Sequence, residues 1–314
     1  MQLSDIQQAR KMIQPYIQET PLVHVDFLDQ NNTRFFLKCE HLQVTNSFKT
    51  RGAFYTLLSL SPEEKKRGVV TRSAGNFGKA CAYAGQILNI PVTIVMPTHA
   101  PDVKKEGVKK YGATVVIHGS KHKESQDKVD SIAKEEGLLP LSPYDNNNVI
   151  IGQGTLGLEI KEQIPSIRSY IAPISGGGLM GGSAFALKQL GPTITTIGVE
   201  PVGASDYFLS CKEGKKITLE NTHSCADGLL APTVGTLNWP LLQANVDTPL
   251  LVSEQEIIDA MKFLYTKLGM IVEPSGAVSV AALLFHPELA LQGDTVAVIS
   301  GGNVDLDKFY KWVE

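Results

Sequence analysis

Cysteine is scarce in this sequence, and its few thiols are widely spaced. The 314 residues include four cysteines, and no two of them stand in a Cys-x-x-Cys spacing. Four thiols in a chain of this length do not form the dense disulfide framework that stabilises small secreted domains. We therefore expect a protein of a reducing compartment, the cytoplasm.

An excess of charge of one sign is also missing, as is any long apolar run. Lys and Arg number 29 against 32 Asp and Glu, a net charge of -3, which gives no broad attraction for nucleic acid or an anionic membrane. The best apolar run, residues 277–285, is too short to span a bilayer, and residues 1–13 lack a secretory apolar segment. The expected partner is a small molecule, and neither nucleic acid nor a membrane.

Runs rich in valine and isoleucine alternate along the chain with amphipathic helical patterns. This alternation predicts an α/β fold, in which mainly parallel, twisted sheets are flanked by helices. In the first half, strands are expected at residues 35–40, 69–71, 92–96 and 114–117. In the second half, they are expected at residues 170–174, 195–200 and 295–300.

The length favours two domains that share a cleft, since 314 residues exceed the usual size of one domain. An asparagine-rich break at residues 146–148 indicates a boundary. We predict a large domain of residues 1–60 and 147–314 and a small domain of residues 61–146. Helix starts are expected at Ser4, with Gln7 three residues later, and at Ser61, which precedes a proline and two glutamates.

A lysine stands among apolar and small residues in the heptapeptide that runs from Ser47 to Ala53, and this lysine is Lys49. A lysine ammonium is strongly hydrated, so its burial at the start of an apolar helix is costly unless it pairs, loses its proton or bonds covalently. A bond to a carbonyl cofactor would remove that cost. Alternatively, Lys49 is a surface residue whose amine lies in water.

A second motif, residues 71–78, follows a short strand and opens a helix. Its free backbone N–H groups and small side chains can form a cup for an anion such as a substrate carboxylate. Within it, the amide of Asn76 can donate to a ring hydroxyl or phenolate oxygen near the lysine. The alternative is an ordinary strand-to-helix turn that Asn76 caps.

Glycines gather in a third motif, residues 175–182, which again follows a strand. Consecutive glycines let the backbone approach a phosphate, and the next helix points its positive end at it. Gly176, Gly178 and Gly181 also satisfy G-x-G-x-x-G, and Glu200 lies where a dinucleotide fingerprint places its ribose-binding acid. A nicotinamide-dependent dehydrogenase is therefore an alternative, although it leaves Lys49 and Asn76 without a role.

A fourth motif closes the series at Ser300, where a buried strand runs into the turn Ser-Gly-Gly-Asn. Ligands of open α/β sheets bind at the carboxyl ends of strands. A serine hydroxyl there can hydrogen-bond a pyridine nitrogen without forcing it to carry a proton, whereas an aspartate would favour the pyridinium. Alternatively, Ser300 caps the final turn.

These motifs occur together and in a fixed order. They are S-F-K-x-R-G-A from Ser47, S-A-G-N from Ser73, the glycine-rich turn from Ser175, E-P-S-G-A from Glu273 and S-G-G-N from Ser300. In this order and spacing the chain resembles, over essentially its whole length, the serine/threonine dehydratase and serine racemase family. These are pyridoxal phosphate-dependent enzymes of fold type II, with a fold like that of the tryptophan synthase β chain.

The resemblance implies a role for each motif. Lys49 becomes the catalytic lysine that bonds the aldehyde of pyridoxal 5'-phosphate, Asn76 contacts the cofactor's ring oxygen, and Ser300 partners the ring nitrogen. The phosphate cradle consists of Ser175, Gly176, Gly177, Gly178 and Leu179. The residues that flank the ring are Phe48 and Gly228. The loop that grips the substrate carboxylate consists of Ser73, Ala74, Gly75, Asn76 and Phe77. The large domain would bind the cofactor and the small domain would grip the substrate.

The chain departs from its family at several positions. Ala74 stands where racemases of the family carry a serine that reprotonates the second face of the α-carbon, and dehydratases resemble this chain in having alanine there. Phe77 replaces a more usual histidine, Lys79 a more usual glutamine, and Ser175 the first glycine of a four-glycine run. Ala74 argues for elimination, whereas Phe77 and Lys79 indicate no particular substrate.

The segment from Glu200 to Asp206 resembles the divalent-cation loop of the racemase-like members. Two carboxylates and a backbone carbonyl are hard oxygen ligands of the kind that suit Mg, Mn or Ca. The candidate ligands are Glu200, Asp206 and the carbonyl of Ala204. The alternative is a solvated acidic turn after a strand.

The sequence therefore predicts a cytoplasmic lyase that removes water from L-threonine, L-serine or both, and yields a 2-oxo acid and ammonia. A serine racemase-like enzyme, or a lyase for another β-hydroxy amino acid, remains the alternative within the family. A noncatalytic cofactor sensor would bind the cofactor without turnover. The resemblance also implies a homodimer.

Overall fold

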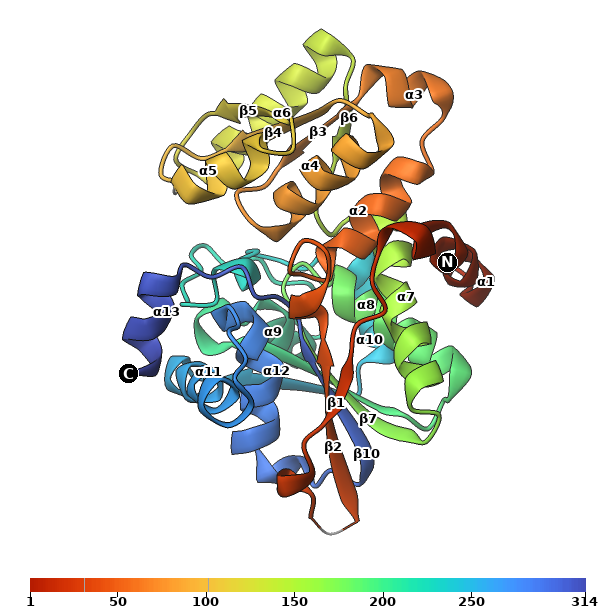
Figure 1. The fold of residues 1–314 in the computed structure, drawn as a ribbon, viewed down its shortest axis with the longest axis vertical. Coiled ribbons are helices and arrows are strands. Elements are labelled where there is room, and N and C mark those ends of the chain that lie inside the picture. Colours follow the sequence, from red (N-terminus) through yellow and green to blue (C-terminus); the bar gives the residue numbers. More distant parts are fainter. Residues whose placement is uncertain (31, 101) are drawn as a thin grey trace.

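Two sheets organise the computed structural model, which describes residues 1–30, 32–100 and 102–314. A 6-stranded sheet has the order β1-β2-β10-β7-β8-β9, and a 4-stranded sheet has the order β5-β4-β3-β6. In Figure 1 the smaller sheet and its helices lie above the larger sheet, and the two termini lie on opposite sides. This arrangement confirms the predicted α/β class with mainly parallel sheets flanked by helices.

The larger sheet is parallel except at one edge, where β1 pairs antiparallel with β2. Its strands are β1 (Leu22–His24), β2 (Thr33–Cys39), β7 (Ile167–Pro173), β8 (Thr195–Pro201), β9 (Thr248–Val252) and β10 (Gly293–Ile299). The strands expected at 35–40, 170–174, 195–200 and 295–300 are confirmed with small shifts in their ends. The sequence missed β1 and β9, which lie at the two edges of the sheet and are only partly buried.

The smaller sheet is parallel throughout. Its strands are β3 (Val69–Arg72), β4 (Val92–Met96), β5 (Thr114–Ile117) and β6 (Leu139–Leu141). The bounds of β4 and β5 match the predicted ranges, and β3 is one residue longer. The sequence missed β6, a short edge strand with a proline at its centre, which an edge position tolerates.

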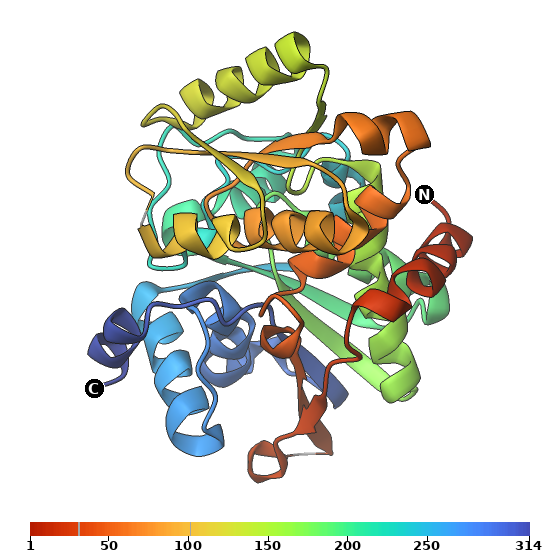
Figure 2. The same ribbon diagram turned by 45° about the horizontal axis from the view of Figure 1, so that its top comes forward.

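Helices cover both faces of each sheet, and Figure 2 shows this layering from a second direction. They are α1 (Leu3–Ile13), α2 (Lys49–Leu58), α3 (Pro62–Arg67), α4 (Asn76–Leu88), α5 (Asp102–Lys109), α6 (His122–Glu136), α7 (Asn147–Gln163), α8 (Gly178–Leu190), α9 (Asp206–Glu213), α10 (Asn238–Asn245), α11 (Glu254–Leu268), α12 (Pro274–Phe285) and α13 (Leu306–Val313). One apolar core packs the larger sheet against α11 and α12, and another packs its opposite face against α7 and α8. The division at residues 60 and 146 stays a prediction.

The helix starts follow from local hydrogen bonds. Ser61 caps α3 as predicted, since its Oγ accepts from the Glu64 N–H at 3.2 Å and its own N–H donates to the Glu64 carboxylate at 2.8 Å. The start predicted at Ser4 is wrong, because Gln2 is the cap of α1 and donates its N–H to Asp5 at 2.7 Å. The asparagine-rich break is itself a helix start, with Asn146 accepting from two N–H groups of α7.

Helix α7 packs closely against both α2 and α8 through glycines. A Cβ on Gly152 would lie 2.7 Å from the Cα of Gly52 in α2, a distance that real side chains do not reach. A Cβ on Gly182 of α8 would collide with the carbonyl oxygen of Ile150. The glycines therefore permit a backbone approach that any side chain would prevent. Across the described residues, no helix combines the length and the apolar character needed to cross a membrane.

Candidate active site

Lys49 is the first residue of α2, and its amine lies in an apolar setting. The Nζ atom is 5.0 Å from the ring centroid of Phe48 and 5.9 Å from that of Phe77. It donates a hydrogen bond of 3.0 Å to the carbonyl oxygen of Pro143. Burial lowers the pKa of Lys49 to about 8, and Cys81 and Glu273 oppose that shift. This environment differs from that of a surface lysine with its amine in water.

The segment that precedes Lys49 is tied to the turn after β10. Phe48 donates its N–H to the carbonyl of Ser300 at 3.2 Å, and Ser47 forms a β-bridge with Gly301. The hydroxyls of Thr45 and Thr50 lie 2.5 Å apart and join the two sides of the turn that leads into α2. The predicted aldehyde-bonding lysine and the predicted partner of the ring nitrogen therefore come from adjacent backbone segments.

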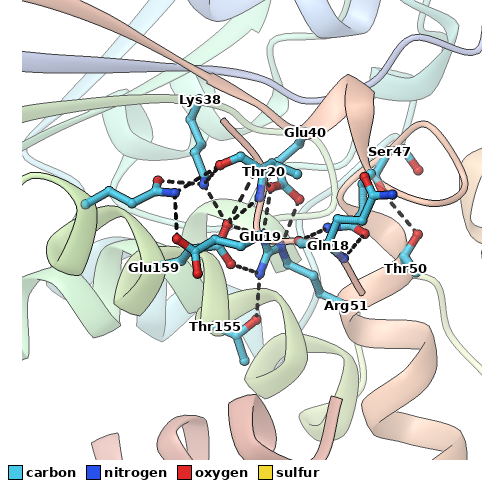
Figure 3. A network of polar contacts seen from close by, with 12 residues as sticks. Gln18, Glu19, Thr20, Lys38, Glu40, Ser47, Thr50, Arg51, Thr155 and Glu159 are labelled. Carbon is cyan, nitrogen blue, oxygen red and sulfur yellow. Dashed lines mark hydrogen bonds and ion pairs between the residues drawn. The ribbon is translucent and has the colours of Figure 1, made fainter. Parts of the chain in front are cut away.

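Two residues after Lys49, Arg51 anchors α2 in a buried ion cluster (Figure 3). We define this cluster as Lys38, Glu40, Arg51 and Glu159, whose side chains are at most 3% exposed. The guanidinium of Arg51 makes two hydrogen bonds of 2.8 Å to Glu40 and two of 2.9 Å to Glu159. Lys38 donates to Glu159 at 2.6 Å. The fork of Arg51 is thus satisfied on both of its edges.

The buried ion cluster balances its charges, with two cations beside two carboxylates. Burial would raise the pKa of Glu159, but Arg51 and Lys38 lower it to about 2. Burial acts against the charge on Arg51, yet Glu40 and Glu159 raise its pKa above the ordinary value. Arg51 and Glu159 therefore hold each other in their charged forms, whereas burial lowers the pKa of Lys38. Arg51 was visible in the lysine motif, but no sequence signal assigned it a partner.

Asn76 begins α4, and both ends of its amide are engaged. Its Nδ2 donates to Glu273 at 2.5 Å, and its Oδ1 accepts from Asn303 at 2.8 Å. Glu273 is 4% exposed and also contributes to the electrostatic environment of Lys49. Asn76 and Lys49 therefore meet around one carboxylate. Glu273 and Asn303 belong to two of the sequence motifs, but the motifs alone indicated no function for either residue.

The turn before Asn76 is held in place by the side chain of Ser73. The Oγ of Ser73 accepts from the N–H of Gly75 at 3.3 Å and from that of Gly78 at 2.9 Å, which fixes the loop. Ala74 is partly buried and contributes only a methyl group. The side chain of Phe77 is 2% exposed and packs in the apolar core of the smaller sheet. The predicted loop can therefore offer a ligand its backbone and the side chain of Ser73. The side chain of Phe77 is packed in the core and offers little.

The glycine-rich turn leads from β7 into α8. Gly177 has a φ of 92°, a left-handed conformation that favours glycine, and α8 begins at Gly178. A Cβ on Gly176 would collide with the ring of Tyr144, which lies against this turn. Ser175 accepts from the N–H of Ala231 through its Oγ at 3.2 Å, so its hydroxyl is engaged in holding the loop. The first N–H groups of α8 suit a phosphate.

Ser300 lies at the carboxyl end of β10 and is 4% exposed. Its Oγ donates to the carbonyl oxygen of Ser275 at 3.1 Å. The hydroxyl of Ser275 in turn accepts from the N–H of Gly228 at 2.9 Å, so Ser300 and Gly228 share a neighbour. The residues predicted to contact and to flank a cofactor ring therefore converge near Lys49.

Glu200 and Asp206 are buried, which argues against a solvated acidic turn. Glu200 accepts from the N–H groups of Tyr207 at 3.0 Å and Phe208 at 2.7 Å, so its carboxylate caps α9 and is not directed at a ribose. Both side-chain oxygens of Asp206 are buried, and among the described residues no hydrogen bond of ordinary geometry reaches them, although Glu200 lies close enough to share a proton with Asp206. Burial raises the pKa of Asp206 to about 7.

The raised pKa of Glu200 has the same physical cause, burial, followed by the nearby charge of Asp206. Two buried carboxylates of this kind require either a proton or a cation. Considering the described part of the chain, no group of three His, Cys, Asp or Glu side chains is placed to hold a metal. A cation would therefore need the predicted carbonyl of Ala204 and water in addition to the two carboxylates.

Comparison with known proteins agrees with the motifs. Residues 13–302 match the family described as pyridoxal-phosphate dependent enzyme. A serine racemase of Arabidopsis thaliana is 40% identical over 311 residues, 97% of this chain and 94% of the relative. An L-threonine ammonia-lyase of Thermotoga maritima is 38% identical over 307 residues, 97% of this chain and 76% of that protein. The solved structure of maize serine racemase has a TM-score of 0.95 and 37% identity, and the match covers 98% of this chain and 95% of that one.

These similarities extend over nearly the whole chain and leave the dinucleotide alternative without support. They include racemases and ammonia-lyases at similar identity, so they define the family more closely than the reaction. The chain belongs to the pyridoxal-phosphate dependent enzymes of fold type II, among the relatives of serine racemases and threonine dehydratases.

Proposed function

We propose that this enzyme removes water from L-threonine, L-serine or both, and releases a 2-oxo acid and ammonia. The observation that carries the proposal is the position of the Lys49 amine. Its pKa is lowered to about 8 by burial, and it lies beside the segment of Ser300 and near Glu273, the partner of Asn76. An amine with this pKa can act as a nucleophile and as a base near neutral pH.

Each part of pyridoxal 5'-phosphate has a suitable partner in this proposal. Lys49 would bond the aldehyde and Asn76 would donate to the ring oxygen. The hydroxyl of Ser300, which donates to the carbonyl oxygen of Ser275, would turn to donate to the ring nitrogen. Phe48 and Gly228 flank the ring. The phosphate is held by the turn that consists of Ser175, Gly176, Gly177, Gly178 and Leu179. When bound, the cofactor supplies an electron sink that stabilises negative charge at the substrate α-carbon.

The remaining residues bind the amino acid and move its protons. Ser73 and the backbone N–H groups of residues 74–77 hold the substrate carboxylate. The Lys49 amine, freed when the amino group of the substrate takes its place, would then remove the α-proton from the face that it occupies. The proton that Lys49 gains balances the one that the β-hydroxyl must take up to leave as water. A hydroxyl amino acid is required, since the reaction needs that leaving group. The smaller sheet with its helices, within residues 61–146, would grip the substrate, while residues 1–60 and 147–314 would bind the cofactor.

The residue at position 74 decides between elimination and racemisation. Racemisation requires a proton donor on the face of the α-carbon opposite the lysine, and the methyl group of Ala74 cannot donate one. A serine racemase-like reaction is the second candidate, favoured by the 40% identity to a plant serine racemase. Both reactions share the cofactor and Lys49, so they differ only in the fate of the α-carbon.

The test is a product assay on the purified protein loaded with pyridoxal 5'-phosphate. We expect ammonia and a 2-oxo acid from L-threonine or L-serine, and no comparable formation of D-serine. The K49A variant should lose both the visible absorbance of the bonded cofactor and the turnover, while its circular dichroism stays that of the wild type. Rapid formation of D-serine without ammonia would replace elimination by racemisation, and full turnover by K49A would overturn the assignment of the lysine.

We also propose that Glu200, Asp206 and the carbonyl of Ala204 bind a divalent cation, Mg, Mn or Ca. The support is the buried carboxylate of Asp206 beside Glu200. A cation would satisfy both carboxylates together. Added Mg, Mn or Ca should raise the melting temperature of metal-stripped protein, and the D206N variant should not respond. An equal response of both proteins would place the cation elsewhere.

A further inference from the structure

A chain of hydrogen bonds crosses from α4 to the segments that carry the two last motifs. We call it the cleft chain and define it as Lys79, Asn303, Asn76 and Glu273. The Nζ of Lys79 donates to Asn303 Oδ1 at 2.5 Å, and Asn303 Nδ2 donates to Asn76 Oδ1 at 2.8 Å. Asn76 Nδ2 then donates to Glu273 Oε1 at 2.5 Å. An ammonium and a carboxylate thus lie at opposite ends of two amides.

The two ends give this chain a single direction. An ammonium can only donate and an ionised carboxylate can only accept, whereas each amide can do both. Lys79 therefore fixes Oδ1 of Asn303 as the acceptor, and Asn303 Nδ2 also donates to the carbonyl of Thr45 at 2.9 Å. Asn303 can then only donate to Asn76, so Oδ1 of Asn76 faces Asn303 and its Nδ2 faces Glu273. A reversed amide at either position would bring two donors or two acceptors together.

The direction of the chain determines what Asn76 can offer to a ligand. One N–H of its Nδ2 is given to Glu273, and no described residue takes the other. That second N–H is the group that a ring oxygen would need. Lys79 lies three residues after Asn76 in α4, so both side chains are on the same face of the helix.

We propose that Lys79 is a positioning residue, which acts through Asn303 to hold the amide of Asn76 with its N–H toward the cofactor's ring oxygen. This role rests on the proposed binding of pyridoxal 5'-phosphate by Lys49 and Asn76. This role explains why position 79 carries a lysine although we propose no contact between that lysine and the substrate. A glutamine could donate to Asn303, but it could also turn its own amide around and reverse the chain, which an ammonium cannot do.

The test compares the visible absorption spectrum of the cofactor-loaded K79M, K79Q and K79R variants with that of the wild type, in the absence of any amino acid. We expect K79M to change the ratio of the cofactor's absorption bands and to weaken cofactor binding by about three- to tenfold, the size of one ordinary hydrogen bond, since Lys79 acts on the cofactor only through Asn303 and Asn76. K79R, which also only donates, should stay close to the wild type, and K79Q should lie between them.

Lys110 supplies a matched control. It is exposed and close enough to influence the pKa of Lys79, but it lies outside the cleft chain. The K110M variant removes the same charge from the same neighbourhood and should leave the spectrum and the cofactor affinity unchanged. Circular dichroism shows whether each variant has folded. If K79M has not folded, K79Q takes its place in the comparison.

Each outcome decides the proposal. A K79M spectrum and cofactor affinity equal to those of the wild type would overturn it. So would a K79M variant that only raises KM for the amino acid, because that result makes Lys79 a substrate contact. An equal spectral change in K110M would assign the effect to local charge and would also overturn it. If the wild type itself shows no visible cofactor band, the proposed function fails, which is distinct from failure of the Lys79 proposal.

Discussion

Two polar networks lie on either side of the segment that carries Lys49, and they differ in burial and in composition. The buried ion cluster joins β2, α2 and α7 through four charged groups that are at most 3% exposed. The cleft chain joins α4 to the segments at Glu273 and Asn303, and it contains two neutral amides and a partly exposed Lys79. The first network anchors α2, and in our proposal the second orients Asn76 toward the cofactor.

The physical difference between the networks predicts different consequences when they are damaged. Removing one charge from a buried, ionised cluster leaves its partners without compensation, which is costly in stability. An amide in a cleft can exchange its partner for water at a smaller cost. We therefore expect changes in the buried ion cluster to reduce folding stability, and changes in the cleft chain to alter cofactor binding and chemistry.

The largest effect on stability is expected for R51M. This variant leaves Glu40 and Glu159 buried with only Lys38 for charge balance, so the free energy of unfolding should fall by about 3–5 kcal/mol. Urea denaturation measures this change. The control is K109M, which breaks an exposed pair with Glu106 and should change the free energy by less than about 1 kcal/mol. Similar losses in the two variants would remove the distinction between the networks.

The next effect concerns the pH dependence of cofactor capture by Lys49. Only the neutral amine can attack the aldehyde, and burial lowers the pKa of Lys49 to about 8 from its model-peptide value of 10.5. The charged group that faces it is Glu273, since burial raises the pKa of the Cys81 thiol well above that of the amine. The rate at which cofactor-free protein bonds pyridoxal 5'-phosphate should therefore rise about tenfold per pH unit below 8 and level off above it. Stopped-flow absorbance measures this rate. A profile that still rises at pH 10 would contradict the lowered pKa.

A third variant, E273Q, tests whether the carboxylate at the end of the cleft chain also sets the pH dependence of cofactor capture. Removing the carboxylate should move the midpoint of the capture profile to lower pH, since the negative charge of Glu273 raises the pKa of Lys49. It should also lower kcat by about tenfold, because the neutral amide oxygen of a glutamine accepts more weakly from Asn76 than a carboxylate does. R51K is the comparison, since Arg51 does not contribute to the pKa of Lys49. An unchanged midpoint in E273Q, or an equal shift in R51K, would argue against separate roles.

The smallest effect is expected for A74S, which adds one hydroxyl to the carboxylate loop. If the face opposite Lys49 lacks only a proton donor, this variant should form a small amount of D-serine from L-serine while ammonia release continues. Chiral chromatography of the product measures it. A74G is the matched control without a hydroxyl. D-Serine from both variants, or from the wild type, would show that position 74 does not control the stereochemistry.

Much of the fold was predictable because the strands and turns carry local signals. Residues 92–96 and 114–117 are valine- and isoleucine-rich, and they form β4 and β5 with those bounds. The edge strands β1, β6 and β9 were missed, since they are short and only partly buried, and β6 and β9 each contain a proline. Ser4 resembled a cap in sequence, but Gln2 and Asp5 make the capping interaction instead.

The candidate site was predictable in its motifs but not in its connections. Lys49, Asn76 and Ser300 were named from the sequence, and the structure brings their segments together, while their roles stay predictions. The partners Glu40 and Glu159 of Arg51, and the partner Glu273 of Asn76, are remote in sequence and give no periodic signal. Tyr144, which lies against Gly176, had no sequence signal at all. Such pairings depend on the tertiary arrangement of several elements.

The glycine contacts of α7 have a consequence for the size of ligand that this site accepts. Lys49 begins α2, the glycine-rich turn begins α8, and α7 packs between these two helices without side chains at the points of closest approach. The separation between the backbone of Lys49 and the turn is thus set by direct backbone contacts, and only the side chain of Lys49 can adjust the position of the amine. We therefore expect the site to select cofactors by length. An analogue longer or shorter than pyridoxal 5'-phosphate would bond the amine or occupy the glycine-rich turn, but would not do both.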